Sequence, residues 1–188
     1  VCGGFPARPD GFRYKFSWSP LGVLRALCAP AQYRQHFTDL TLARPWQGVR
    51  RYDAPLARPE SFEVYPNRDS LSFLADYRFD PEWKVRDFVR GTLRPLGWAE
   101  AWEEVFQDLE RLDGDEAGLK TLSDRLWRDH AYGPDEADRV VLCVSLRAER
   151  HGRAVYDRIW TLDATGDLRG SAMARLVSGP VSLAAEAV

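Results

Sequence analysis

The strongest pattern in the sequence is a pair of long β-strands joined by a very short turn. Residues 138–163 are rich in β-branched, aromatic and other apolar side chains, and His151-Gly152 interrupts them near the middle. A two-residue connection of this kind between two strand patterns is typical of an antiparallel hairpin. Apolar residues lie on both sides of the first strand, which predicts burial on both faces. The fold of this chain must therefore include an antiparallel sheet.

Four longer helical patterns occupy other parts of the chain. Ser19 followed by Pro20 predicts an N-cap and a first helical position, with the helix running to about Ala29. Residues 97–112 carry an apolar stripe at helical spacing, and a second helix follows the turn at Gly114. Residues 170–188 are also expected to be helical, with an interruption near Gly179-Pro180.

Shorter extended segments complete the pattern. Strands are predicted at residues 13–19, 37–43 and 60–65, and again at 83–94, with a helix from Asp69 or Ser70 to Tyr77. Together these elements predict one α+β domain over residues 1–188, with a mainly antiparallel mixed sheet and helices packed on one face.

Composition narrows the classes of protein that this chain can represent. Its formal net charge of −2 gives no general attraction to nucleic acid or to an anionic membrane, so neither is expected as a partner. No apolar run is long enough to cross a bilayer, and the first twenty residues lack a signal-peptide pattern, which favours a cytoplasmic location. The three cysteines and three histidines are isolated, so a metal site is not expected. Because the only methionine is Met173, we expect a fragment of a longer chain.

The sequence carries no self-contained active-site motif. It lacks the glycine-rich dinucleotide fingerprint, the phosphate-binding loop, the nucleophile elbow and the zinc-protease motif. Arg86, Arg90 and Arg94 would share one face of a strand and could bind carboxylates or phosphates, or they could form an ordinary solvated face. In "YPNRDS", Asn67 and Asp69 are common turn residues, and Arg68 between them is a possible ligand-binding side chain.

Five stretches, taken together, resemble one known family. In chain order they are "CGGFP", "YKFSWSPLGVL", "YPNRDS", "RGTLRPLGW" and "SAMARLVSGPV". They are similar to the saccharopine dehydrogenase (saccharopine reductase) family, and the resemblance extends from Cys2 to the last helix. It implies a parent protein in which a Rossmann domain binds NAD or NADP and an inserted α+β domain closes over the substrate and forms a homodimer contact. This chain resembles the inserted domain alone.

The resemblance also implies a chemistry and a set of binding residues. Family members transfer a hydride between the nicotinamide and the C–N bond of a secondary amine derived from an amino acid. Related members include lysine dehydrogenases and carboxynorspermidine synthases, so the fold does not define the substrate. By position, the residues implied in substrate binding come from the second, third and fourth stretches: Ser17, Trp18, Ser19, Asn67, Arg68, Asp69, Arg90 and Arg94.

The chain departs from the family at one informative position. An arginine that grips a substrate carboxylate often stands where this chain has Leu21, and leucine cannot donate such hydrogen bonds. The resemblance therefore does not imply strict specificity for saccharopine, and the sequence does not identify the substrate. No catalytic residue, cofactor-binding residue or metal ligand is predicted within these 188 residues, and the isolated chain is expected to be inactive. The partners expected are a second copy, the missing Rossmann domain and a small amino-acid-like substrate.

Two other functions are compatible with the same residues. The domain could be a non-catalytic association module, or it could sense a small molecule through the arginine row at residues 86, 90 and 94. A G-x-G-x-x-G motif before Val1 in the parent gene would favour the enzyme, and its absence would favour the module.

Overall fold

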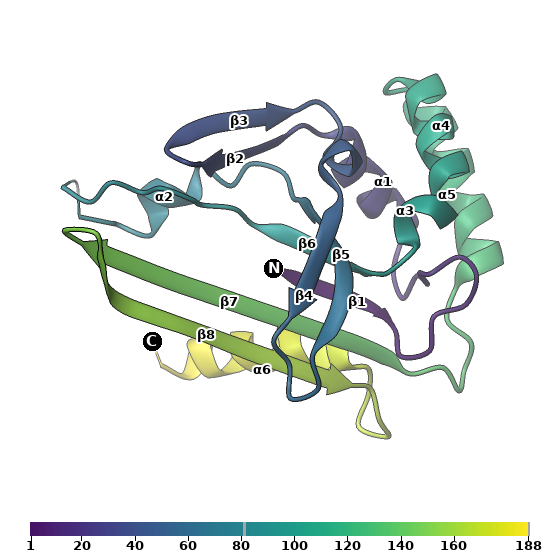
Figure 1. Cartoon of the computed structure of the whole chain (residues 1–188). Helices are drawn as coiled ribbons and strands as arrows, with labels where there is room; N and C mark the ends of the chain where they lie inside the picture. The colour runs from purple at the N-terminus through teal and green to yellow at the C-terminus, as the bar shows by residue number, and fades with distance from the viewer. Residues whose placement is uncertain (81, 188) are drawn as a thin grey trace.

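The computed structural model describes residues 1–80 and 82–187, and this part of the chain forms a six-stranded sheet, a two-stranded ribbon and six α-helices (Figure 1). The strand order in the large sheet is β4-β5-β6-β1-β7-β8. The strands are β1 (Cys2–Pro6), β2 (Ala31–Gln35), β3 (Thr38–Leu42), β4 (Arg50–Ala54), β5 (Glu60–Pro66), β6 (Gly91–Pro95), β7 (Asp138–Arg150) and β8 (Arg153–Thr165). The helices are α1 (Pro20–Cys28), α2 (Phe73–Asp76), α3 (Trp98–Ala101), α4 (Glu103–Leu112), α5 (Glu116–His130) and α6 (Ala172–Glu186), with a 3-10 turn η1 at Pro45–Gly48.

The sheet has the predicted mixed and mainly antiparallel character. Only β1 and β6 pair in parallel, while every other neighbouring pair is antiparallel. The predicted hairpin is confirmed, because β7 and β8 pair from Arg139 and Thr165 to Arg150 and Arg153, with one register shift at Ala148/Glu149. Its turn has positive φ angles of 51° at His151 and 74° at Gly152, a left-handed conformation that matches the twist of the flanking strands.

Only the first part of the hairpin is buried on both faces. Val140, Val141 and Cys143 are buried, whereas Val144 and Leu146 are 45% and 48% exposed. The difference follows from the lengths of the neighbouring strands. β1 pairs with β7 only as far as Leu142, so the outer half of the hairpin has no third strand beside it. The prediction of two buried faces holds for the base of the hairpin and is wrong for its outer half.

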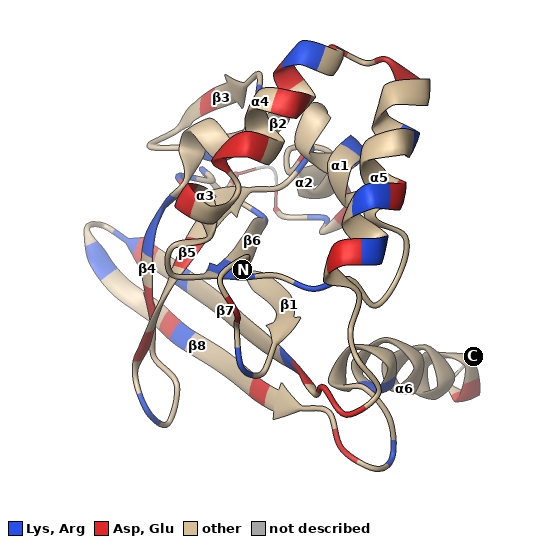
Figure 2. Cartoon of the chain, turned by 90° about the vertical axis from the view of Figure 1, so that its right-hand side faces the viewer, with Lys and Arg blue, Asp and Glu red and all other residues tan. Residues whose placement is uncertain are grey.

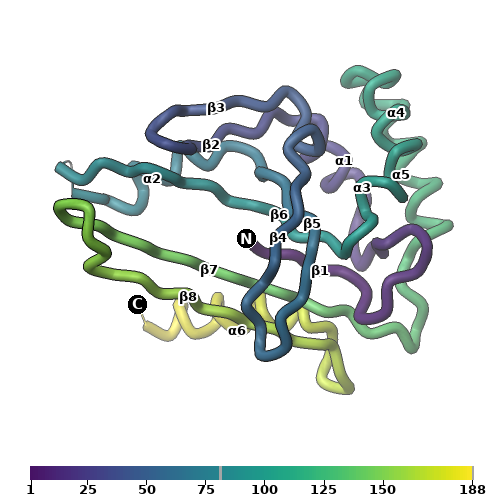
Figure 3. The backbone as a smooth tube through the Cα atoms, in the orientation of Figure 1, coloured from purple at the N-terminus to yellow at the C-terminus, as the bar shows by residue number. Residues whose placement is uncertain are grey.

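The large sheet is strongly curled. Three strand spacings separate β5 from β7, which would place them about 14 Å apart in a flat sheet. Yet Arg139 on β7 binds Glu60 on β5 at 2.7 Å, and it also binds Asp163 on β8 at 2.7 Å. This guanidinium holds the pKa of the Asp163 carboxyl below its ordinary value. Figure 3 shows β4 and β5 crossing over β7 and β8, as this curl requires.

Helices cover one face of the sheet, as predicted. Trp98 of α3 stacks on Tyr65 of β5, with 5.0 Å between the ring centroids. At the other end, a side chain on Gly4 of β1 would collide with Met173 of α6. Thr92 pairs with Tyr65 of β5 and with Cys2 of β1, so these three side chains point to the same face of the sheet. Gly4 lies two residues after Cys2 and therefore faces the same way. Asp138 fixes the start of α6 by accepting hydrogen bonds from the first two backbone amides of that helix.

Several predicted element boundaries are wrong. The predicted strand 83–94 is reduced to β6 at Gly91–Pro95, and Phe88 forms only an isolated bridge with Arg34. The helix predicted at 69–77 shortens to the four residues of α2. The apolar stripe at 97–112 divides into α3 and α4 at Trp102. The predicted strand 13–19 contributes a single bridge, from Phe16 to Ala131.

The last helix is continuous where an interruption was predicted. α6 runs from Ala172 to Glu186 with Pro180 inside it, while Val188, the final residue of the predicted helix, lies outside the described residues. Pro180 removes one hydrogen bond of the helix, and its ring crowds the preceding turn. Gly179, the residue before it, has open space around it. None of the described helices is long and apolar enough to cross a bilayer.

Candidate functional site

The segment "YKFSWSP" leaves the core and ends at an exposed tryptophan. Tyr14 and Phe16 are buried and lie 5.6 and 6.1 Å from the Trp102 ring, whereas Trp18 is 53% exposed. The Phe16 amide donates to the carbonyl of His130, at the end of α5. Burial lowers the pKa of the His130 imidazole, whose ring stacks on Phe12. The core thus anchors one end of the segment and presents the other end to solvent.

The predicted helix start at Ser19 and Pro20 is confirmed. Ser19 is the N-cap of α1 and Pro20 is its first residue, although the serine hydroxyl makes no capping hydrogen bond. Leu21 is partly buried and packs against the core. Its side chain is therefore used in packing.

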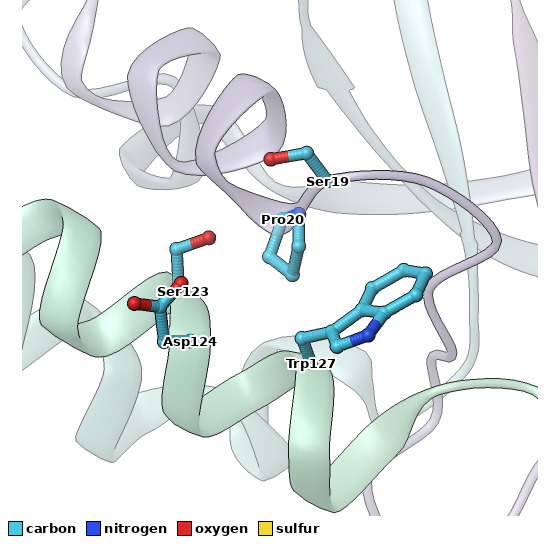
Figure 4. Close-up of a pocket in the computed structure, with 5 residues that line it drawn as sticks. All are labelled: Ser19, Pro20, Ser123, Asp124 and Trp127. Atoms are coloured by element: carbon cyan, nitrogen blue, oxygen red, sulfur yellow. The ribbon is translucent and has the colours of Figure 1, made fainter.

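A shallow pocket of about 250 Å³ opens between this helix start and α5 (Figure 4). Ser19 and Pro20 form one side, and Ser123, Asp124 and Trp127 project from α5 to form the other. Sequence reasoning missed the α5 residues. The available signal was Trp127, a large aromatic that falls outside the buried stripe of its helix and is half exposed. α5 carries acidic and basic residues in mixed order, whereas α4 is mainly acidic (Figure 2).

The "YPNRDS" turn is held on two sides by backbone hydrogen bonds. On one side, the Gln32 amide donates to the Arg68 carbonyl at 2.9 Å, and the Ser70 amide donates to the Gln32 carbonyl at 2.8 Å. On the other side, the Asn67 amide donates to the Arg90 carbonyl at 2.8 Å, and the Arg90 amide donates to the Ser70 hydroxyl at 2.9 Å. The turn is therefore fixed between β2 and the segment that leads into β6.

Within this turn the three candidate side chains have different surroundings. Asp69 accepts hydrogen bonds from the amides of Leu71 and Ser72, so its carboxylate is already engaged. Asn67 is partly buried. Arg68 is exposed, has a φ of 52°, and forms no ion pair or side-chain hydrogen bond with any described residue. This left-handed conformation costs a non-glycine residue about 1–2 kcal/mol, and six other non-glycine residues of the described chain also adopt it.

The predicted row of three arginines on one strand face does not exist. Only Arg94 lies in β6, because the chain before Gly91 is irregular. Arg94 is 6% exposed, and its guanidinium donates to the Tyr65 hydroxyl and lies over the Tyr14 ring. Arg90 is exposed and lies 4.0 Å from the centre of the Phe73 ring. Arg86 is exposed and pairs with Asp87.

The structure therefore brings together only some of the predicted site residues. Asn67, Arg68, Asp69 and Arg90 share one hydrogen-bonded turn. This turn lies beside β2, which follows the C-terminal end of α1. Ser17, Trp18 and Ser19 lie at the N-terminal end of α1, a helix about 13 Å long. No hydrogen bond or ion pair links the two sets within the described residues. Chemically, Arg68 and Arg90 offer guanidinium groups for carboxylates, and Trp18 offers an aromatic surface.

These features define an α+β domain that presents cationic and aromatic side chains but has no dinucleotide-binding loop in its sequence. The chain belongs to the saccharopine dehydrogenase C-terminal domain family, whose pattern it matches over residues 1–188. The resemblance predicted from the five sequence stretches is thus confirmed.

Individual relatives agree with this assignment. The mitochondrial alpha-aminoadipic semialdehyde synthase of Bos taurus is 26% identical, over 98% of this chain and 27% of that protein. The saccharopine dehydrogenase [NADP(+), L-glutamate-forming] of Saccharomyces cerevisiae is 37% identical over 102 residues, 53% of this chain and 22% of that protein. The structure of the apo, histidine-tagged L-Glu-forming saccharopine dehydrogenase from S. cerevisiae matches with a TM-score of 0.74 and 26% identity, over 98% of this chain and 56% of that one. The chain thus spans about a quarter of the length of the first two relatives.

Proposed function

We propose that this chain is the substrate-binding and dimerisation domain of a saccharopine dehydrogenase-like, NAD(P)-dependent oxidoreductase that acts on a C–N bond of an amino-acid-derived secondary amine. The observation that carries the proposal is the rigid turn at residues 67–70, which presents the exposed guanidinium of Arg68 without a partner among the described residues. Such a substrate carries carboxylates, and a preorganised arginine binds a carboxylate through two hydrogen bonds.

The other candidate residues have distinct places in this proposal. Arg90 supplies a second cation beside the same turn, and Trp18, between Ser17 and Ser19, supplies an aromatic wall. Asn67 and Asp69 shape the turn. Arg94 supports the site from within, because its buried guanidinium lies over Tyr14 in the segment that leads to Trp18.

The residues of this chain do not fit a nicotinamide cofactor. The sequence has no glycine-rich loop at the start of a helix, the usual cradle for the pyrophosphate. We therefore derive no hydride-transfer step from these residues. NAD or NADP would bind to another part of the parent protein. A cytoplasmic location remains a prediction, since the mammalian relatives are named as mitochondrial.

The first test separates this domain from its parent. We expect these 188 residues to show no binding of NADPH in isothermal titration calorimetry, and no turnover, because they lack a phosphate-binding loop. The full-length parent should bind NADPH and oxidise or form a secondary amine. Micromolar NADPH binding by the isolated chain would contradict the proposal that the cofactor binds to another part of the parent protein. A parent that binds no nicotinamide nucleotide would instead favour a non-catalytic association module.

Self-association should use the outer half of the β7–β8 hairpin. Val144, Leu146 and Trp160 share one face of the hairpin and are 45%, 48% and 50% exposed, and β8 is an edge strand of the sheet. Exposed apolar patches and unpaired edges favour association with another chain. Light scattering should therefore give the mass of a dimer for the full-length protein. Trp160→Lys should shift it to a monomer, while the control Trp83→Lys, at another exposed tryptophan, should not. A monomeric wild-type protein would refute the proposed dimer.

A further inference from the structure

The exposed indole of Trp18 lies directly on the first turn of α1. A Cβ atom placed on Gly22 would lie only 2.5 Å from Cζ3 and 2.7 Å from Cη2 of the Trp18 ring. Carbon atoms in contact normally keep about 3.5–4.0 Å between them. The ring therefore occupies the space that any side chain at position 22 would need.

The backbone gives no other reason for a glycine at this position. Gly22 lies inside the nine-residue helix α1, and its φ is not in the left-handed region that favours glycine. Glycine is among the least favourable residues for a helix interior, so it weakens a helix that is already short. The space taken by the Trp18 ring accounts for its presence.

We infer that Gly22 is a positioning residue for Trp18. This inference rests on the proposed function, because that function places Trp18 in contact with the substrate. The absence of a side chain at position 22 lets one side of the indole lie against the helix. The rest of the ring stays open to solvent, and Trp18 is 53% exposed. The helix therefore fixes the position and orientation of the indole face that contacts the substrate.

Adding a single methyl group at position 22 would displace this surface. The ring is the free end of a side chain, whereas position 22 is fixed in the helix backbone, so the ring is the part that moves. Restoring an ordinary contact requires a shift of about 1 Å. Displacements of this size in a binding site reduce the rate of an enzyme by up to about 10²-fold.

The first experiment tests the packing on the chain itself. The chain is labelled with 5-fluorotryptophan, and Trp18→Phe identifies the ¹⁹F resonance of Trp18. Gly22→Ala should shift that resonance and leave those of the buried Trp98 and Trp102 in place. The matched control is Gly179→Ala, a second helical glycine with open space around it, which should leave the Trp18 resonance unchanged. An unchanged Trp18 resonance in Gly22→Ala would overturn the inference.

Thermal stability provides an independent check of the same contact. Without the Trp18 ring, alanine at position 22 should raise Tm, because it favours the helix more than glycine does. With the ring present, the collision should reduce or reverse that gain. The effect of Gly22→Ala on Tm should therefore be more positive in the Trp18→Ala background than in the wild type. Equal effects in both backgrounds would show that positions 18 and 22 are not coupled.

The second experiment tests the functional part in the full-length parent. Gly22→Ala should raise KM by about tenfold or more while kcat changes less, because the change acts on substrate binding through Trp18. In the Trp18→Ala background it should add no further loss. If the ¹⁹F resonance shifts but neither Gly22→Ala nor Trp18→Ala alters KM, the positioning role is overturned together with the placement of Trp18 in the site. If Trp18→Ala raises KM and Gly22→Ala does not, the proposed function stands and only this inference fails.

Discussion

Replacing Trp102 with alanine is expected to lower the free energy of unfolding by about 4 kcal/mol, a large part of the stability of a domain this size. The Trp102 side chain is fully buried at the junction of α3 and α4. Its ring lies within about 5–6.5 Å of five neighbours, measured between ring centroids: Phe12, Tyr14, Phe16, Trp98 and Phe106. Alanine would leave a cavity among aromatic rings that cannot collapse easily, and the Phe12 carbonyl would lose its hydrogen bond from the indole.

The same substitution tests how the core supports the candidate site. Tyr14 and Phe16 contact Trp102 and belong to the segment that carries Trp18. Urea unfolding followed by circular dichroism would measure the loss, with Trp83→Ala as the control. Trp83 is 66% exposed, so its replacement should change the free energy of unfolding by less than about 0.5 kcal/mol. A Trp102→Ala protein as stable as the control would show that this aromatic cluster does not anchor the segment.

The features that could be predicted from sequence are those that depend on neighbouring residues. The β7–β8 hairpin was predictable because strand pattern and turn chemistry agree around Gly152. The start of α1 was predictable because Ser19 and Pro20 form a local helix signal. The resemblance to the family rested on short stretches in a given order, and residues 1–188 do match that family.

Features that depend on distant packing could not be predicted in this way. Arg94 alternates with apolar residues like a surface side chain, yet Tyr14 and Tyr65 enclose it, from segments about 80 and 30 residues away. The segment before Gly91 was expected to be a strand. It instead hydrogen-bonds to the β2 hairpin through Phe88 and Arg34, so it cannot continue β6. The pocket beside Ser19 was missed because its other wall comes from α5, about a hundred residues further along the chain.

Replacing Arg68 with alanine in the full-length parent is expected to lower kcat/KM by about 10²-fold. A charge-assisted hydrogen-bonded pair contributes about 1.5–3 kcal/mol, and 2.8 kcal/mol corresponds to a factor of 10². Arg68 should contribute in this range because hydrogen bonds on both sides hold its backbone. Lysine keeps the charge but loses the planar two-pronged geometry, so Arg68→Lys should recover only part of the activity. The control is Arg128→Ala, at an exposed arginine of α5, which should stay within about twofold of the wild type.

Thermal stability distinguishes an arginine that binds substrate from one that only stabilises the fold. With φ at 52°, Arg68 holds a conformation that costs an L-residue about 1–2 kcal/mol and glycine almost nothing. Arg68→Gly should therefore unfold at an equal or higher temperature than the wild type while losing as much activity as Arg68→Ala. An arginine that serves only the fold predicts the reverse, with stability falling and kcat/KM unchanged. Measuring Tm and kcat/KM on the same three variants decides between them, because a substrate-binding arginine and a structural arginine change these two quantities in opposite directions.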